Sequence, residues 1–335
     1  MSNTQLYRSI LAARKPSDFI LPGRFVIRIK TDNAGASEDN QFTLTGAEVS
    51  SGSTFPVTYS PVSDPFNYTD VTLNVSDPTI TVPVAGEYYV QYGSPLNRVR
   101  FNDGGDRRKV TSAPLQWGNI AWFSMFTAFY GCANMGDEKA KDVPDLSSVT
   151  NARDTFREAL DFNQDIGAWD VSSVEDTRSM FQVATAFNQD IGEWDTSAVT
   201  VMQRMFRVAT AFNQDIGNWD VRNVINMSEM FQSANAFNQS LENWELRLAG
   251  VGMSNMLNNC GLDVVNTSRT LIGFANYVHA NSGSPSGVPL GASGLEYHDT
   301  EYPGIGSGHF TDAVSALDYL TNTANWTITG LTNVS

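Results

Sequence analysis

Cationic side chains are scarce in this chain. Its 335 residues include 21 Lys and Arg against 36 Asp and Glu, which gives a formal net charge of −15. A protein that binds a nucleic-acid backbone needs clustered Lys and Arg, so this balance argues against nucleic acid as a partner. The excess of carboxylates instead fits a protein of a salty medium, or one that meets a cationic partner.

Cysteine is nearly absent as well. Only Cys132 and Cys260 occur, one on each side of a central repeated region. If the repeats stack with a spacing of about 5 Å, four of them separate these residues by roughly 20 Å. A disulfide needs Cα atoms within about 7 Å. We therefore expect two free thiols that pack as small buried hydrophobic side chains.

Signals for export and for catalysis are also missing. No apolar run reaches the length of a membrane span or of a signal-peptide core. His279, His298 and His309 have no metal-ligand spacing, and neither a GxSxG elbow nor a phosphate-binding glycine loop is present. We expect no enzyme activity, no metal or cofactor and no membrane insertion. The missing signal favours release by lysis, as for a phage component, or an unrecognised secretion route.

Proline is absent between Pro144 and Pro285, so nothing there blocks strand pairing or helices. Within that stretch, residues 151–245 contain four copies of one 25-residue pattern. A fixed period of this length predicts a solenoid whose units stack on their neighbours. The residues that recur at this interval, and that we expect to point inward, are Phe156, Phe181, Phe206 and Phe231, with Trp169, Trp194, Trp219 and Trp244.

One unit can be interpreted physically. Val199, Met202, Met205 and Phe206 lie three or four residues apart, as on one face of a helix. An Asn-Gln-Asp turn and a short apolar segment such as Ile-Gly-Glu-Trp complete the unit. Asp and Ser then precede the next helix, where both cap well. Each unit is thus predicted to be a short strand, a turn and a short helix.

The repeated phrase FNQDIGxWDVSxVxxMxxMF resembles the BspA-type leucine-rich repeat in its 25-residue form, known from mycoplasma lipoproteins and from bacterial and phage surface proteins. The resemblance implies a curved α/β solenoid used for binding. It brings no catalytic residues with it.

Residues 24–103 have a different pattern. Seven short alternating segments rich in β-branched and aromatic residues predict an all-β sandwich. The phrase VAGEYYVQY and its place before the repeats resemble PKD-type immunoglobulin-like domains. The expected fold is therefore multidomain, an immunoglobulin-like sandwich followed by an α/β leucine-rich-repeat-like solenoid with atypical caps.

The remaining segments complete this organisation. Residues 1–23 form an N-terminal arm, 104–116 a joint with a basic triplet, and 117–150 an opening coil. Residues 246–335 form a C-terminal cap. In that cap we expect a helix capped by Thr267 or Ser268, a Gly/Ser/Pro loop over 281–294, a second short helix in DAVSALDYL and a closing strand in NWTITGLT.

The arm is basic on an acidic protein. It is either a frayed terminus or a docking segment that orders against a partner. On the second interpretation it contacts other virion proteins or a symmetry copy, within a homo-oligomeric assembly. The residues predicted to make these contacts are Leu6, Tyr7, Arg8, Ile10, Leu11, Arg14 and Lys15.

Polar residues also repeat with the 25-residue period. Stacked carboxylates could bind Ca²⁺, but Asn ladders that satisfy turn backbone and Asp residues that cap turns explain the same pattern and are preferred. These rows are Asn163, Asn188, Asn213 and Asn238; Asp165, Asp190 and Asp215, ended by Ser240; and Asp170, Asp195 and Asp220, ended by Glu245.

The residue before each repeated Trp differs between copies. Ala168, Glu193, Asn218 and Asn243 are therefore the candidate ligand-binding residues, although drift on a solvated face would produce the same variation. The function expected from the sequence is a non-enzymatic phage virion protein, displayed on head or tail, that attaches to neighbouring virion proteins or to a host protein or glycan. The alternatives are a bacterial surface or secreted adhesin and a carbohydrate-binding accessory protein.

Overall fold

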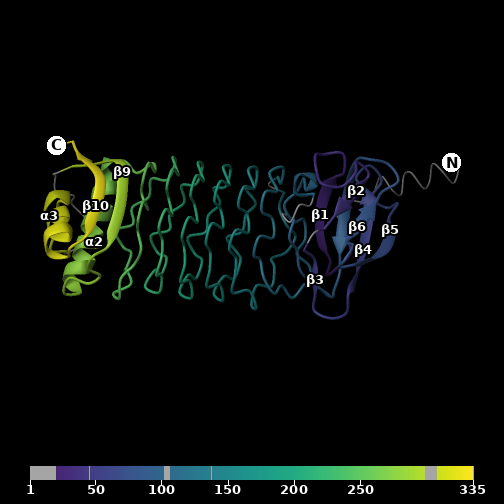
Figure 1. Cartoon of the computed structure of the whole chain (residues 1–335), viewed down its shortest axis with the longest axis horizontal. Helices are drawn as coiled ribbons and strands as arrows, with labels where there is room; N and C mark the ends of the chain where they lie inside the picture. Colours follow the sequence, from purple (N-terminus) through teal and green to yellow (C-terminus); the bar gives the residue numbers. More distant parts are fainter. Residues whose placement is uncertain (1–19, 45, 102–105, 137, 299–307, 335) are drawn as a thin grey trace.

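The computed structural model describes residues 20–44, 46–101, 106–136, 138–298 and 308–334. The molecule is elongated, with a β-rich region at its N-terminal end, a stack of coils in the middle and a helical region at its C-terminal end (Figure 1). The described strands of the N-terminal region are β1 Phe25–Lys30, β2 Gln41–Thr43, β3 Glu48–Val49, β4 Thr54–Pro61, β5 Thr69–Asn74, β6 Thr79–Thr81, β7 Glu87–Tyr92 and β8 Leu96–Arg98.

The N-terminal region contains one larger antiparallel sheet, in the order β1-β7-β4-β5, and two small ones, β2-β6 and β3-β8. All seven segments predicted from alternation contain a strand, and the two-residue β3 is the one additional strand among the described residues of this region. Alternate side chains of these strands enclose an aromatic and aliphatic core, in which Phe42 and Phe101 lie 6.1 Å apart by ring centroid.

The described part of the predicted joint is tied to the first sheet. Residues 110 and 116 form antiparallel bridges with Ile29 and Val26 of β1. A short 3-10 helix, η2 Arg107–Lys109, precedes them. Its Lys109 is fully buried beside Asp106, with Nζ 3.8 Å from the carboxylate. The segment is therefore held by a buried charge pair as well as by backbone bonds.

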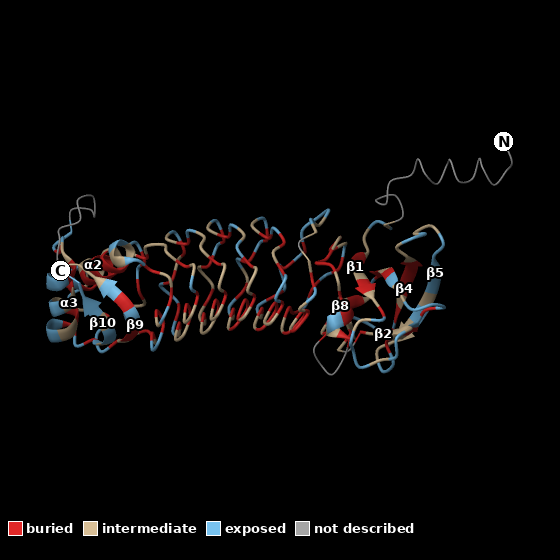
Figure 2. Ribbon diagram, turned by 90° about the horizontal axis from the view of Figure 1, so that it is seen from above, coloured by how far each residue is buried: buried red, intermediate tan, exposed pale blue. Residues whose placement is uncertain are grey.

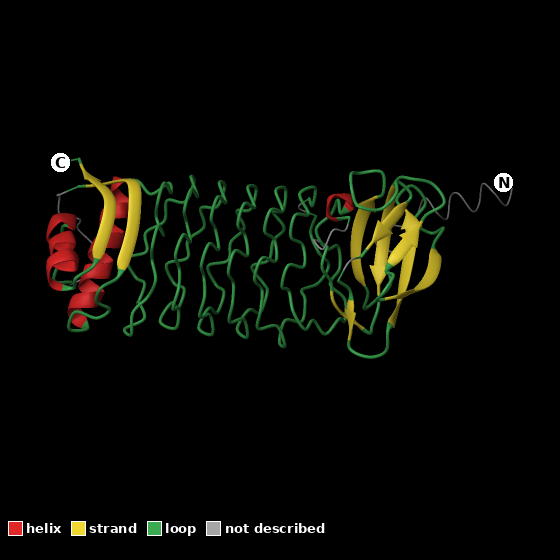
Figure 3. Cartoon of the chain, viewed as in Figure 1, coloured by secondary structure: helices red, strands yellow, loops and turns green. Residues whose placement is uncertain are grey.

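Residues 151–245, all of which the structure describes, contain turns and single bridges but neither a helix nor a strand (Figure 3). The predicted strand–turn–helix unit is therefore wrong. Backbone N–H groups of Met202, Arg204, Phe206 and Val208 donate to carbonyls of the next coil, between 2.9 and 3.0 Å away. Between them, the N–H groups of Met205 and Arg207 close tight turns by donating to the carbonyls three residues back.

Left-handed backbone at two positions per coil explains why no helix forms. Arg204 has φ +60° and Val208 has φ +61°, and the equivalent residues of the neighbouring coils also have positive φ. An L-residue in this region interrupts a right-handed helix. The consecutive tight turns still bring residues three or four apart to one side, so they give the same apolar spacing as a helix.

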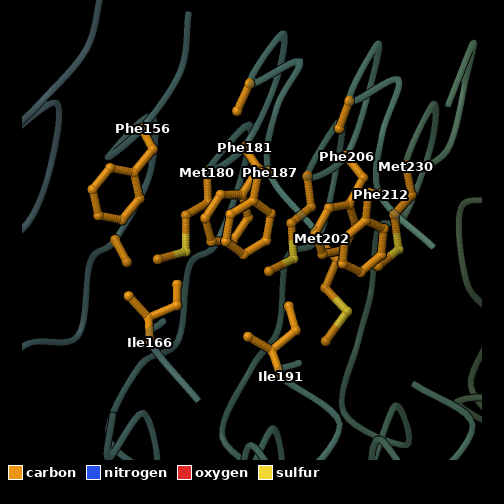
Figure 4. Close-up of a cluster of buried hydrophobic side chains, with 14 of the residues drawn as sticks. Phe156, Ile166, Met180, Phe181, Phe187, Ile191, Met202, Phe206, Phe212 and Met230 are labelled. Carbon is orange, nitrogen blue, oxygen red and sulfur yellow. The ribbon is translucent and has the colours of Figure 1, made fainter. Parts of the chain in front are cut away.

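The core of the stack is a set of side-chain columns (Figure 4). The rings of Phe156, Phe181, Phe206 and Phe231 follow one another with centroids 5.6–5.8 Å apart and planes within 11°. The predicted inward orientation of Phe and Trp is confirmed, since no repeated Trp is more than 5% exposed.

The tryptophans also join the coils by hydrogen bonds. The indole Nε1 of Trp194 donates to Ile166 O at 3.2 Å, and that of Trp219 donates to Ile191 O at 3.0 Å. The indole of Trp244 donates to Ile216 O at 3.0 Å in the same way. The buried indoles of these three tryptophans thus find their acceptors in the preceding coil.

The N-terminal end of the stack shares its core with the first sheet. Trp117 and Trp122 pack edge-on at 5.8 Å, and Phe25 of β1 packs against both. Colouring by burial shows this continuous buried interior along the molecule (Figure 2). Both cysteines are buried and free, as expected from the sequence.

The C-terminal end is covered by α2 Val264–Ala280, β9 Pro289–Tyr297, α3 Ala313–Asp318, the π-helical turn η3 Tyr319–Thr323 and β10 Thr327–Asn333. Strands β9 and β10 are parallel, and Leu290 bridges to Met253 of the last coil. The predicted helices and closing strand are present. Two details were wrong: Asp263 caps α2, and the expected loop over 281–294 includes the start of β9.

Candidate functional site

The four candidate ligand-binding residues form one exposed row along an edge of the stack. Ala168, Glu193, Asn218 and Asn243 are all exposed, one per coil. They lie in turns, so their placement in a strand was wrong.

Local chemistry fixes the turns of this row in the first two repeats, whereas the fourth repeat has Glu242 at the glycine position. In the second repeat, Gly192 N donates to Asp190 Oδ1 at 3.0 Å, and a Cβ on Gly192 would lie 2.6 Å from the Asp215 carbonyl oxygen of the next coil. Trp194 on the other side is buried. With glycine required before it and an anchored Trp after it, Glu193 points into solvent.

A row of carboxylates follows the tryptophans. Asp170 and Asp195 each accept the backbone N–H of the serine two residues later. Hydrogen bonds from the hydroxyls of Ser172 and Ser197 lower the pKa of the two carboxyls below the ordinary value, and bonds from the backbone N–H groups of the same serines add a smaller effect. These carboxylates are therefore bonded locally within their own turns.

The third repeat departs from this pattern, because Arg222 stands where the earlier repeats have serine. Its guanidinium makes a bidentate bond to Asp220, with Nε 3.0 Å from Oδ1 and NH2 2.6 Å from Oδ2. Glu245 lies 3.9 Å from NH1. The hydrogen bond to Arg222 lowers the pKa of the Asp220 carboxyl, and the same contact raises the pKa of Arg222.

These residues surround a shallow hollow of about 340 Å³, lined by the 217–222 segment with Asn243 and Glu245. Two of the predicted ligand-binding residues, Asn218 and Asn243, thus come together there, while Ala168 and Glu193 lie outside its lining. Within the described residues, the amides of Asn218 and Asn243 make no hydrogen bond. The hollow therefore offers free amides beside a neutralised Asp220–Arg222 pair.

Sequence reasoning missed Arg222, although a signal was present. The position two residues after the repeated carboxylate is serine three times, at Ser147, Ser172 and Ser197, and then changes to arginine. This substitution lies three residues after Trp, outside the position that carries the predicted ligand-binding residues.

The asparagine row satisfies turn backbone, as predicted from the sequence. Asn188 N donates to Asn163 Oδ1 at 2.9 Å, and Asn213 N donates to Asn188 Oδ1 at 2.8 Å. The row continues to Asp263, the cap of α2, whose N–H donates to Asn238 Oδ1. Each Asn side chain therefore satisfies the turn backbone of the next coil.

Other candidate chemistry is limited. Among the described residues, no three His, Cys, Asp or Glu side chains gather in a way that could hold a metal ion. Burial raises the pKa of both thiols, that of Cys260 to about 11. The predicted assembly contacts of the arm, from Leu6 to Lys15, lie outside the described residues.

Comparison with known proteins identifies one related region. A family model described as "Mycoplasma protein of unknown function, DUF285" matches residues 123–244. This range runs from the opening coil to the last repeated Trp. No curated protein and no solved structure matches the chain. No helix in the described ranges has both the length and the apolarity needed to cross a membrane.

Proposed function

We propose that this protein is a non-enzymatic virion structural protein, displayed on a phage head or tail, whose repeat region is a binding module for a host surface or a neighbouring virion protein. The repeat region would be a solenoid of the BspA-type leucine-rich-repeat class, and the N-terminal sheets an immunoglobulin-like module that carries it. In this arrangement the N-terminal end belongs to the particle and the stack extends outward.

The observation that carries the binding function is the exposed row that ends in the hollow at Asn218 and Asn243. Residues around the row are held by repeated structural contacts. The residue type within the row varies between repeats, and its side chains make no hydrogen bond to any described residue. The fold does not depend on contacts of these side chains, so they can be substituted to suit a ligand while the rigid backbone beneath them is kept.

The binding function is tested on the intact protein. Asn218→Ala with Asn243→Ala should abolish adsorption to host cells or purified host envelope while the melting temperature stays within a degree or two. Ser148→Ala, an exposed change outside the hollow, is the matched control. Undiminished adsorption by the double variant would exclude the hollow as the binding surface.

The virion location is tested through the arm. Mass spectrometry of purified particles should detect the full-length protein, and deletion of residues 1–20 should abolish its incorporation while leaving its melting temperature within a degree or two. Normal incorporation of the truncated protein would move the anchor to the N-terminal sheets.

A bacterial surface adhesin is the second candidate, favoured by the mycoplasma description of the matching family model. It predicts that the protein is recovered with the cell envelope and is absent from particles, so the same fractionation separates the two functions.

A further inference from the structure

The basic triplet of the joint divides into two parts with different roles. Lys109 is used inside the protein, where its ammonium donates to the carbonyls of Ser37, Glu38 and Gln41 at 2.8–3.1 Å. Arg107 and Arg108 are at the surface, the first half-exposed and the second exposed. Two adjacent cations therefore remain in a strongly acidic protein.

Neither arginine is ion-paired with a described carboxylate. Within the part of the chain that the structure describes, no carboxylate lies within 4.0 Å of either guanidinium. Several arginines of the stack are paired, as Arg178 is with Asp176 at 3.3 Å and Arg204 with Glu229 at 2.8 Å. Two neighbouring like charges without a counter-charge repel each other, and a bound anion would remove that cost.

The orientation of Arg107 is set by an aromatic ring. Its guanidinium carbon lies 5.8 Å from the ring centroid of Tyr130, and that of Arg157 lies 5.0 Å from the same centroid. This contact holds the long side chain of Arg107 over Tyr130, so less freedom is lost when it binds a ligand.

The two arginines line a pocket of about 210 Å³ together with Ala34 and Gly35. The backbone that follows Ala34 and Gly35 is held in place, because the N–H groups of residues 36 and 37 donate to Asp106 Oδ1 at 2.9 and 3.0 Å. A Cβ on Gly35 would lie 2.3 Å from that oxygen. Residues 35–37 thus pack directly against the buried Asp106–Lys109 pair, so the pocket is formed before any ligand binds.

We propose that this pocket binds a phosphate group, either as free inorganic phosphate or as the phosphate of a larger molecule such as a sugar phosphate. Two guanidinium groups supply several N–H donors and positive charge, the combination that recognises phosphate. The volume suits one compact group. Exposed Asp32, Glu38 and Asp39 in the same loop disfavour a ligand with many closely spaced negative charges.

The test is calorimetric titration of the full chain at constant ionic strength with inorganic phosphate, glucose 6-phosphate and, as a carboxylate control, glucuronate. Arg107→Gln with Arg108→Gln should weaken phosphate binding at least about tenfold, whereas Arg178→Gln should leave it unchanged. Tighter binding of glucose 6-phosphate identifies an attached phosphate; equal or weaker binding identifies free phosphate.

Three results would overturn the proposal: no phosphate binding at millimolar concentration, equal affinity in the double variant, or glucuronate binding as tightly as phosphate. If the double variant does not fold, Arg108→Gln alone serves, because that side chain is exposed. The proposal is independent of the hollow at Asn218 and Asn243, so failure of one leaves the other standing.

Discussion

The stack of coils and the N-terminal sheets are built from different kinds of contact. In the stack, one contact recurs from coil to coil, such as the indole bond from Trp219 to Ile191 O, which Trp194 and Trp244 repeat. In the N-terminal region each contact occurs once, such as the buried pair of Asp106 and Lys109. The stack can therefore lose a contact and keep its equivalents one coil away, whereas the sheets have no second copy of theirs.

The largest loss of stability is expected at Trp219. Trp219→Ala should lower the free energy of unfolding by about 5 kcal/mol, the upper end for large-to-small core changes, because a cavity forms and Ile191 O loses its donor. Chemical denaturation measures this, with Trp219→Phe as a smaller change at the same place. A loss below about 1 kcal/mol would show that the coils do not depend on this column.

A smaller loss is expected in the N-terminal region. Lys109→Met should cost about 3 kcal/mol, because three carbonyls lose their donor and Asp106 loses its counter-charge. The cost stays at the lower end of the range since Asp106 keeps its backbone donors, Ala36, Ser37 and Thr43. Arg108→Met, an exposed neighbour, should stay within about 0.5 kcal/mol. Equal effects of the two substitutions would refute the role of the buried pair.

The sequence predicted the two regions unequally. The strands that contain Phe25 and Tyr92 were predicted correctly, because alternation of apolar and polar side chains there is typical of a β-strand alone. The helix proposed around Phe206 was wrong because Arg204 and Val208 take left-handed backbone without being glycine, so no residue type marked the interruption. Spacing of three or four residues shows which side chains face inward, and leaves open which backbone achieves it.

The sequence predicted two residues of the candidate site but not their neighbours, for a related reason. Comparison of copies identified Asn218 and Asn243 as variable, and the structure brings both to one hollow. Their convergence with Arg222 and Glu245 depends on how adjacent coils superpose, which is a three-dimensional property. The pocket at Arg107 was unpredictable because residues 34–35 and 107–108 are far apart in the sequence.

A pH-dependent effect should separate a surface ion pair from these buried contacts. Hydrogen bonds from Arg204 lower the pKa of Glu229 below its ordinary value of 4.5. The contribution of Glu229 to stability is therefore complete above about pH 4.5 and is lost as the pH falls through the lowered value. Wild type and Glu229→Gln should differ by less than about 1 kcal/mol at pH 7, since the pair is partly solvated, and should converge as the pH falls below the lowered pKa of Glu229. A constant difference in melting temperature across this range would contradict the prediction.

The smallest effect is expected from metal removal. Asp190 and Asp215 already accept N–H groups of their own turns, at 3.0 and 2.9 Å. Chelator should therefore leave the melting temperature unchanged, and Ca²⁺ should not raise it. A rise of several degrees with Ca²⁺ would mean that the rows bind the ion, because a ligand of the folded state stabilises it.

The direction of the indole bonds has an evolutionary consequence. The indoles of Trp194, Trp219 and Trp244 each donate to the preceding coil, so a 25-residue unit within this series carries the donor for the coil before it and the acceptor for the coil after it. In-frame duplication or deletion of one such unit leaves every remaining bond with a partner and both ends covered. The gene can therefore change the reach of the protein in discrete steps, while the number of sites along the exposed row changes with it.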